Sequence, residues 1–197
     1  MNIEKEKIKI AAKHSHLVYF DNKEATLFTE INISGYATKV FIGKEEYLLI
    51  AFAGSNNLED WLDNFTFSKT KLGIHLGWYR SYRLIRSKLK NVLKDNKLPI
   101  LVTGHSAGGA LATIFSLFES KKSSIELYTF GSPKCLTEKH KKRLDARVVS
   151  SCRVTHYWDI VSELPIGDFV HVGKTVPIFW LGFPHFSYDY WMTCNKL

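Results

Sequence analysis

Cysteine is scarce in this 197-residue sequence, and long apolar runs are absent from it. The three cysteines, Cys135, Cys152 and Cys194, are odd in number and lack CxxC spacing, which argues against a disulfide framework or a zinc site. We interpret them as buried or incidental free thiols. No apolar stretch approaches the ~20 residues that cross a bilayer. The opening segment, MNIEKEKIKIAAKHSH, lacks the continuous apolar core of a secretory signal, so we expect a cytoplasmic or already processed chain.

Internal repeats, low-complexity tracts and linkers rich in proline or glycine are also absent. A chain of this length is typical of one domain and can bury a sizeable core. Its hydrophobic fraction of 45% and charged fraction of 23% are ordinary for a soluble globular protein. We therefore predict a single domain over residues 1–197.

Acidic residues are in the minority, with 19 Asp and Glu against 27 Lys and Arg, and the formal net charge is +8. Such an excess favours anionic partners, and both nucleic acid and acidic lipid surfaces carry that charge. No zinc-finger, RRM or KH pattern is present, so we expect no binding to nucleic acid. We expect instead a peripheral contact with an anionic membrane or lipid interface.

The first half of the chain alternates between helical and strand patterns. Apolar spacing predicts an amphipathic helix over Glu4–Phe20. The segments SGYATKVFIG and EEYLLIAFAG predict two strands joined by a tight turn near Gly43–Lys44. A long helix with a basic, water-facing side is expected after Gly77. Its apolar face is formed by Tyr82, Ile85, Leu89 and Val92.

The second half begins with PILVTG, a short apolar run typical of a strand buried on both faces. The segment ALATIFSLFES predicts a helix, and IELYTFGSP, ARVVSSCRVTHYW and DFVHVGK predict further strands. Strands and helices that alternate in this way indicate an α/β fold. We expect a mostly parallel central sheet with helices on both faces.

The pentapeptide GHSAG, from Gly104 to Gly108, matches the pattern G-x-S-x-G. A buried strand precedes it and a helix follows at once, which is the context of a nucleophile elbow. The turn must be sharp, and side chains at Gly104 and Gly108 would collide across it. The small residues therefore leave Ser106 standing at the end of the sheet, ready to act as a nucleophile.

A serine hydroxyl is a weak nucleophile near pH 7 and needs a base that an acid holds in orientation. In this fold the order along the chain is serine, acid, histidine. Four histidines follow the serine: His140, His156, His171 and His185. We expect His140, in the basic run EKHKKR, to lie on a solvated helix face, and His156 to be a packing residue of a strand. His171 and His185 remain as candidates for the base.

The acid should lie just past a late strand, and Asp159 in THYWDIVSELP fits that position best. Glu163 and Asp168 fall in the turn beyond it, where ordinary loop charge explains them.

Four segments, VTGHSAGGALATI, LYTFGSPK, RVTHYWDIVSELP and AFAGSNNLEDWLDNF, resemble class 3 lipases, the fungal-type lipase family of the α/β-hydrolase fold. The resemblance covers roughly Gly35 to Trp191, with the segments in the family's order. It implies that Ser106 is the nucleophile and Asp159 the triad acid. PHFSYDYW resembles the segment with the catalytic histidine, which implies His185, whereas FVHVGK resembles a structural histidine segment.

An oxyanion hole is also needed, because the tetrahedral intermediate carries negative charge. The backbone N–H after the nucleophile belongs to Ala107, and the resemblance implies Ser55 as the second donor. The chain departs from the family at Ala53, where arginine is usual, at Ala107, where a bulky residue is frequent, and at Ser162, where proline is usual. None of these changes removes a catalytic group. No metal or cofactor is implied.

In many relatives a lid helix follows the oxyanion residue. At this place Leu58, Trp61 and Leu62 of the segment Asn57–Asn64 have helical spacing. Two interpretations are open: a mobile lid over an acyl pocket, or a fixed surface helix with Trp61 in the core. The aromatic stretch PIFWLGFPHF near His185 suits either an acyl-binding cleft or the core.

We expect a serine carboxylic ester hydrolase that acts on lipid esters, an acylglycerol lipase that works through a covalent acyl-enzyme. One alternative is a phospholipase A-type acyl hydrolase on anionic membranes, which shares the same machinery. Another is a catalytically silent α/β-hydrolase that serves as a binding module, against which the intact set of serine, aspartate and histidine argues.

Overall fold

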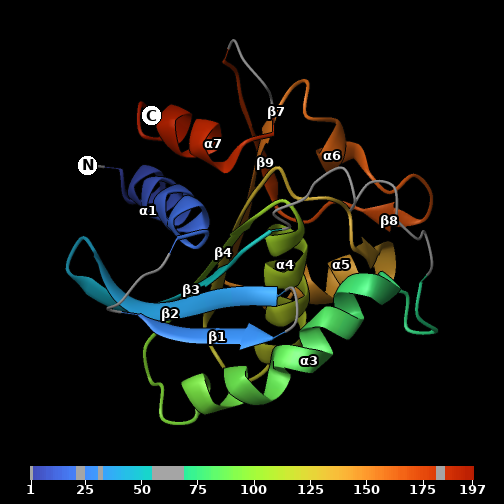
Figure 1. Ribbon diagram of the computed structural model, residues 1–197, viewed down its shortest axis with the longest axis horizontal. Helices are drawn as coiled ribbons and strands as arrows, with labels where there is room; N and C mark the ends of the chain where they lie inside the picture. The colour runs from blue at the N-terminus through green and yellow to red at the C-terminus, as the bar shows by residue number, and fades with distance from the viewer. Residues whose placement is uncertain (1, 21–24, 31–32, 55–68, 181–184) are drawn as a thin grey trace.

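A seven-stranded sheet runs through the middle of the computed structural model, which describes residues 2–20, 25–30, 33–54, 69–180 and 185–197 (Figure 1). The strand order is β1-β2-β3-β4-β5-β7-β9. Neighbours are antiparallel from β1 to β3 and parallel from β3 to β9, so the sheet is mostly parallel, as predicted. The strands are β1 (Thr26–Glu30), β2 (Ile33–Ile42), β3 (Glu45–Phe52), β4 (Ile100–His105), β5 (Ile125–Phe130), β7 (Ser150–His156) and β9 (Lys174–Ile178).

Helices cover both faces of this sheet (Figure 1). One face carries α3 (Leu76–Leu93), α4 (Ala107–Glu119) and α5 (Glu138–Asp145), and the other carries α1 (Ile3–Leu17) and α7 (Ser187–Cys194). A short helix, α6 (Ile160–Glu163), follows β7. Strands β6 (Leu136–Thr137) and β8 (Phe169–Val170) form a separate antiparallel pair. Among the described residues, no helix combines the length and the apolar character that crossing a membrane requires.

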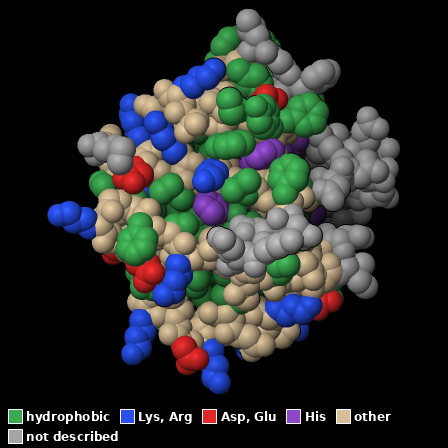
Figure 2. Space-filling view, turned by 60° about the vertical axis from the view of Figure 1, so that its left-hand side comes forward, with side chains coloured by type: hydrophobic (Ala, Val, Ile, Leu, Met, Phe, Trp, Pro, Cys, Tyr) green, Lys and Arg blue, Asp and Glu red, His purple; other side chains and the backbone are tan. Residues whose placement is uncertain are grey.

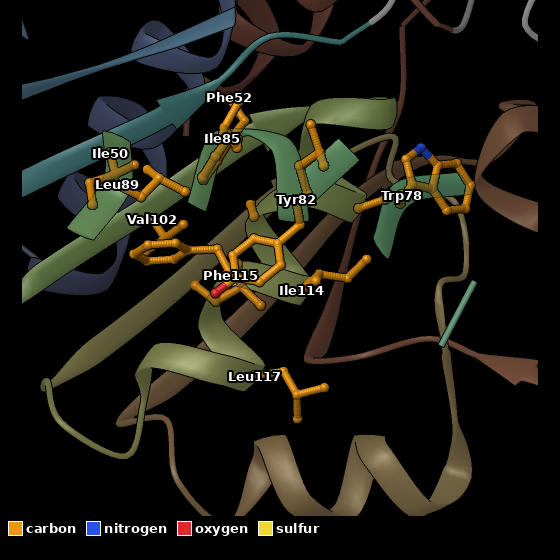
Figure 3. Packing of buried hydrophobic residues seen from close by; sticks show 14 of the residues in the cluster. Ile50, Phe52, Trp78, Tyr82, Ile85, Leu89, Val102, Ile114, Phe115 and Leu117 are labelled. Atoms are coloured by element: carbon orange, nitrogen blue, oxygen red, sulfur yellow. The ribbon is translucent and has the colours of Figure 1, made fainter. Parts of the chain in front are cut away.

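Each face of the sheet has its own hydrophobic core. Under α3 and α4, the side chains of Tyr82, Ile85 and Leu89 point toward Ile114 and Phe115 (Figure 3). All five are nearly inaccessible to solvent. The spacing of the α3 residues is the one that predicted an apolar face, and this face is where the helix packs on α4 and the sheet.

The local patterns predicted most elements correctly. The hairpin turns at residues 43–44, β4 is buried along its whole length, and α4 follows it directly. The first helix ends at Leu17, three residues before the predicted Phe20. Strand β9 was not predicted, because it is an edge strand whose residues are mostly exposed and show little apolar alternation. The predicted free thiols are confirmed, since Cys135, Cys152 and Cys194 are all buried and unpaired.

The predicted exposure of His140 was wrong. His140 is on helix α5, as expected, but only 7% of its surface is accessible. Because His140 and Leu144 are four residues apart, they share the inner face of the helix, and the basic side chains between them cover the other faces. The surrounding run of lysines concealed this arrangement in the sequence.

Helix α4 begins extraordinarily close to the sheet. A Cβ atom at Gly108 would lie 2.2 Å from the carbonyl oxygen of Phe52 in β3, and one at Gly104 would lie 2.4 Å from the backbone of Gly108. Backbone atoms cannot retreat from such contacts without moving the strand or the helix. The structure therefore requires both glycines, as the sharp turn had suggested.

We expect Gly108→Ala to destabilise the protein by more than about 2 kcal/mol, because overpacking here meets backbone rather than a flexible side chain. Gly77→Ala is the matched control, since a Cβ atom there meets nothing closer than 3.4 Å. At this helical position alanine should be neutral or stabilising by up to about 1 kcal/mol. Urea unfolding of the two variants measures the difference. Equal free energies of unfolding would contradict the close-approach argument.

Candidate active site

Ser106 lies in the turn between β4 and α4, at the carboxyl edge of the sheet. Its backbone has φ of 55° and ψ of −130°, and within the described part of the chain no other non-glycine residue has positive φ. The turn is held by the Ser106 N–H, which donates to the carbonyl oxygen of Phe130 at 2.9 Å. Strained backbone of this kind persists only where the surroundings impose it. The geometry is that of a nucleophile elbow.

The amino end of α4 points its first N–H groups into the same region. The Ser106 carbonyl accepts from Gly109 N–H at 2.9 Å, whereas the Ala107 N–H has no acceptor among the described residues. A helix amino end stabilises negative charge, typically by a few tenths of a kcal/mol to about 1 kcal/mol at exposed sites. The Ala107 N–H is therefore free to donate to a negatively charged atom placed beside Ser106.

Asp159 is the N-cap of α6 and is 2% exposed. One carboxylate oxygen accepts from the Val161 N–H at 3.1 Å, and the other accepts from the Tyr190 hydroxyl at 2.7 Å. The Ser162 hydroxyl donates to the Asp159 main-chain carbonyl at 2.8 Å. A buried carboxylate needs such donors, because an unsatisfied charge would be costly. These contacts fix where the carboxylate points.

His185 completes the pair. Its Nδ1 atom lies 2.8 Å from each Asp159 oxygen, so an N–H at Nδ1 donates to the carboxylate. Its Nε2 atom is buried and has no hydrogen-bond partner among the described residues. The ring lies against His105, with centroids 4.7 Å apart, and His105 directly precedes Ser106. In the described part of the chain no hydrogen bond joins His185 to Ser106, although such bonds are often long before substrate binds.

A second, partly buried network lies beside the serine turn, where Tyr19 joins Gly54 to His105. The Tyr19 hydroxyl accepts from the Gly54 N–H at 3.0 Å and lies 3.1 Å from His105 Nδ1. Burial raises the pKa of Tyr19 to about 12, so the hydroxyl keeps its proton and can donate it to His105. Burial and then the nearby His185 hold the pKa of His105 well below its ordinary value, so this ring is neutral.

His171, the other candidate base, is in a different environment. Its Nε2 atom lies 3.4 Å from an Arg153 nitrogen, and the Glu163 carboxylate is 4.0 Å away. Burial first, and then the charges of Arg153 and Lys134, lower its pKa to about 3. The structure thus brings His185 to Asp159 and leaves His171 beside an arginine. His156, as expected, is a packing residue, buried and tilted against Trp180 at a centroid distance of 4.1 Å.

Two of the sequence predictions for this site concern residues that the structure does not describe. Ser55 and the segment Asn57–Asn64 lie outside the described residues. The stretch PIFWLGFPHF begins within β9; Ile178, the last residue of that strand, is buried, and Phe179 is 63% exposed. No group of three or more His, Cys, Asp or Glu side chains within the described ranges is arranged to hold a metal ion.

Sequence reasoning missed the two tyrosines, Tyr19 and Tyr190. Each tyrosine contacts residues that are 31 or more positions away in the chain, so no local spacing predicts the contact. The only available signal for Tyr190 was its place in PHFSYDYW, five residues after His185.

Comparison with known proteins identifies the class. The family model described as "Lipase (class 3)" matches residues 49–169. The chain belongs to the class 3 lipase family, and the resemblance seen in the sequence is thereby confirmed.

Two relatives of known name are secreted fungal lipases. The secreted mono- and diacylglycerol lipase 1 of Fusarium solani is 28% identical over 181 residues, which are 86% of this chain and 50% of that protein. The secreted mono- and diacylglycerol lipase A of Penicillium cyclopium is 30% identical over 159 residues, which are 74% of this chain and 48% of that one. The chain thus spans about half the length of these curated relatives.

The fold is shared with solved lipases. The crystal structure of the lipase from Rhizopus microsporus var. chinensis superposes with a TM-score of 0.77, over 90% of this chain and 75% of that chain. At 19% sequence identity this likeness shows the α/β fold alone.

The environment of His171 predicts a pH effect on stability. The folded pKa near 3 lies below the ordinary 6.5, so between these values the unfolded chain binds a proton that the folded chain does not. This histidine therefore destabilises the fold as pH falls below about 6.5. In His171→Gln the loss of unfolding free energy between pH 7 and pH 5 should shrink by about 1 kcal/mol, with allowance for partial solvent screening. Urea unfolding of wild type and variant at both pH values measures it. An identical loss would mean that the folded ring is protonated.

Proposed function

We propose that the chain is a serine carboxylic ester hydrolase that acts on acylglycerols. The observation that carries this proposal is the strained Ser106 at the elbow together with the buried Asp159–His185 pair. An unrelated structural role would require neither a serine at positive φ nor a histidine with an unpartnered buried nitrogen. Acyl transfer to serine is the chemistry that such a set performs.

In the proposed reaction, the Ser106 hydroxyl attacks the ester carbonyl and His185 Nε2 takes its proton. Asp159 holds the Nδ1–H and stabilises the imidazolium that forms. Tyr190 and the Val161 N–H hold Asp159 in turn. A second charge close to the imidazolium would oppose its formation. Burial keeps His105 neutral, so this neighbour does not do so.

The negative charge on the former carbonyl oxygen needs donors aimed at it. We assign this role to the Ala107 N–H at the amino end of α4 and, with it, to Ser55. Collapse of the intermediate expels the alcohol, which takes the proton from His185, and leaves an acyl group on Ser106. Water activated by His185 then releases the fatty acid. Side chains and backbone supply every group in this scheme, and no cofactor takes part.

Exposed apolar side chains beside the pair support a lipid substrate. Tyr157, Trp158 and Ile160 flank Asp159 in the sequence and are 77%, 66% and 70% exposed. Phe186, next to His185, is 60% exposed. Apolar side chains gathered in this way mark interaction sites. We call Tyr157, Trp158, Ile160 and Phe186 the apolar rim. Since the two relatives above are named mono- and diacylglycerol lipases, we favour acylglycerols as the substrate class.

Apolar groups also reach the surface near α1 and α7. On the face that Figure 2 brings forward, hydrophobic side chains and histidines lie side by side. Between α1 and α7, the His16 ring stacks on Trp191 with centroids 5.1 Å apart and also contacts Phe20 and Tyr188. Such a surface supports contact with a lipid interface beyond the immediate rim.

The net charge of +8 favours a second candidate, an A-type phospholipase on anionic membranes. It would use the same residues in the same roles. Acylglycerol emulsions and vesicles of phosphatidylglycerol, offered in parallel, distinguish the two by the fatty acid that each releases.

We expect Ser106→Ala and His185→Ala each to lower kcat/KM for a soluble nitrophenyl butyrate by at least about 1,000-fold, because triad members act as a unit. The far-ultraviolet circular dichroism spectrum should stay that of the wild type. His171→Ala is the matched histidine control and should retain activity near the wild-type level at 25 °C. If His171→Ala abolished turnover and His185→Ala did not, the base would be His171. A folded Ser106→Ala protein with undiminished activity would refute the proposal.

The apolar rim should matter only at a lipid interface. In Trp158→Ser/Ile160→Ser we expect hydrolysis of a tributyrin emulsion to fall about tenfold or more, since burying two such side chains in lipid is worth a few kcal/mol. Hydrolysis of the soluble ester should change less than about twofold. The control is Leu84→Ser/Val149→Ser, which removes two side chains that are 58% and 64% exposed elsewhere. An equal loss in both double variants would exclude a specific role of the rim.

A further inference from the structure

A cavity of about 680 Å³ opens at the carboxyl end of α4, away from Ser106. Because α4 has 13 residues, at ~1.5 Å rise each, the cavity and the serine are about 20 Å apart. The neighbouring walls come from α3 and α5, which lie on the same face of the sheet (Figure 1). A cavity of this size is in the range of small-molecule sites, typically about 300–1,000 Å³.

The charges in this cavity are almost all positive. Six cationic side chains line it, against the single carboxylate of Glu119. Among the described residues none of the six has an acidic partner within 4.0 Å, although other surface lysines of this chain do. The six are Arg86, Lys90, Lys94, Lys121, Lys122 and Arg143. Like charges brought together without a counter-ion repel one another, so an anion in the cavity would be favoured.

Buried polar atoms on the wall also lack partners. His140, 7% exposed, lines the cavity, and its Nδ1 atom has no hydrogen-bond partner in the described part of the chain. The Nε atom of Arg86, which lines the cavity from α3, is likewise buried and without a partner in the described residues. Buried polar atoms are normally paired, and each exception requires an explanation. A bound anion with several oxygens would supply acceptors once the side chains that cover these two atoms turn aside.

The attraction of cations to the carboxyl ends of helices does not by itself explain the six cations of the cavity. Lys90 and Lys94 lie in and just after the last turn of α3, where cations interact favourably with free carbonyl groups. Arg86 lies a full turn earlier, and Arg143 and His140 come from another helix. Moreover, Arg86, Lys90 and Lys94 follow one another at intervals of four, a spacing at which like charges destabilise a helix.

Part of the cavity wall is apolar, so the cavity suits a ligand that carries an organic group as well as a charge. Leu72, Ile74, Leu93, Leu117 and Phe118 contribute to the lining. Leu117 of α4 is a buried member of the same cluster as Phe115 and also lines the cavity (Figure 3). A ligand that combines a phosphate group with a small organic body would use both kinds of surface.

We propose that this cavity binds a phosphate monoester, with the phosphate group held by the cations of α3, α5 and the segment after α4. A dianionic phosphate has the charge and the acceptor oxygens that the cluster lacks. A soluble phosphate monoester and the headgroup of phosphatidate share this chemistry. The site is independent of ester hydrolysis, because none of its residues belongs to the proposed catalytic set.

Isothermal titration calorimetry with glycerol 3-phosphate tests the site directly. We expect saturable 1:1 binding that Lys90→Gln/Arg143→Gln weakens at least about tenfold, equivalent to 1.4 kcal/mol or more. Both side chains are exposed, so the fold should tolerate the change. The control, Lys13→Gln/Lys44→Gln, removes the same two charges from exposed positions on other elements and should bind as the wild type does. Hydrolysis of nitrophenyl butyrate should be unchanged in both variants, so loss of binding and loss of the proposed activity are read separately.

Sedimentation with vesicles identifies the source of the phosphate. Ser106→Ala protein, in which no ester should be cleaved, is mixed with phosphatidylcholine vesicles with and without phosphatidate. Binding that needs phosphatidate, is lost in the cavity variant and is displaced by glycerol 3-phosphate supports a lipid headgroup. Glycerol 3-phosphate binding without any cavity-dependent vesicle binding supports a soluble ligand. Two results would overturn the proposal: no saturable titration of the wild type up to about 10 mM, or equal weakening by the control variant.

Discussion

The close approach of α4 to the ends of β3 and β4 is the constraint on which the site depends. No side chain fits at Gly108 or Gly104, so the helix starts directly against the sheet and the residue between strand and helix takes positive φ. Such a conformation costs on the order of 1–3 kcal/mol. The burial of 11 of the 13 residues of α4 offsets this cost, because apolar side chains such as Ile114 and Phe115 are removed from water. Core packing thus holds Ser106 in a conformation that it would not adopt alone.

The layer that contains α1 and α7, on the other face of the sheet from α4, holds further parts of the candidate site. Tyr19, which follows α1, links Gly54 at the end of β3 to His105 at the end of β4. Tyr190 of α7 holds Asp159 through its hydroxyl and accepts from the His156 N–H at 3.0 Å. The Tyr190 ring is fully buried, and the Tyr19 ring is partly buried against the same core. The Ser106 turn is therefore set by one layer, and Asp159 and the strand ends by the other. A shift of α1 or α7 would disturb the candidate site without touching Ser106.

Interactions that are local in the chain could be predicted, and those that are not local could not. The elbow follows from five consecutive residues, and the hairpin and the face of α3 follow from short periodicities. The pairing of Asp159 with His185 crosses 26 positions, and chain order with family resemblance pointed to it where periodicity could not. The burial of His140 was missed because helix α5 buries only one narrow face. The lysines next to His140 in the sequence indicate an exposed helix instead. The contacts of Tyr19 exist only once helix and sheet have packed.

Helix α4 joins two regions with opposite electrostatic requirements. At its amino end, free N–H groups favour the negative charge that the proposed reaction develops, and this field is built from backbone dipoles that cannot be displaced. At its carboxyl end, the free carbonyl groups are equivalent to about half a negative elementary charge, which opposes the binding of an anion. The six cations of the cavity exceed that amount several-fold, so the net field there is positive. Those cations are mostly exposed side chains, which salt screens over about 8–10 Å at ordinary ionic strength. The proposed binding in the cavity should therefore depend steeply on salt, whereas the proposed stabilisation of charge beside the buried Ser106 should depend on it little.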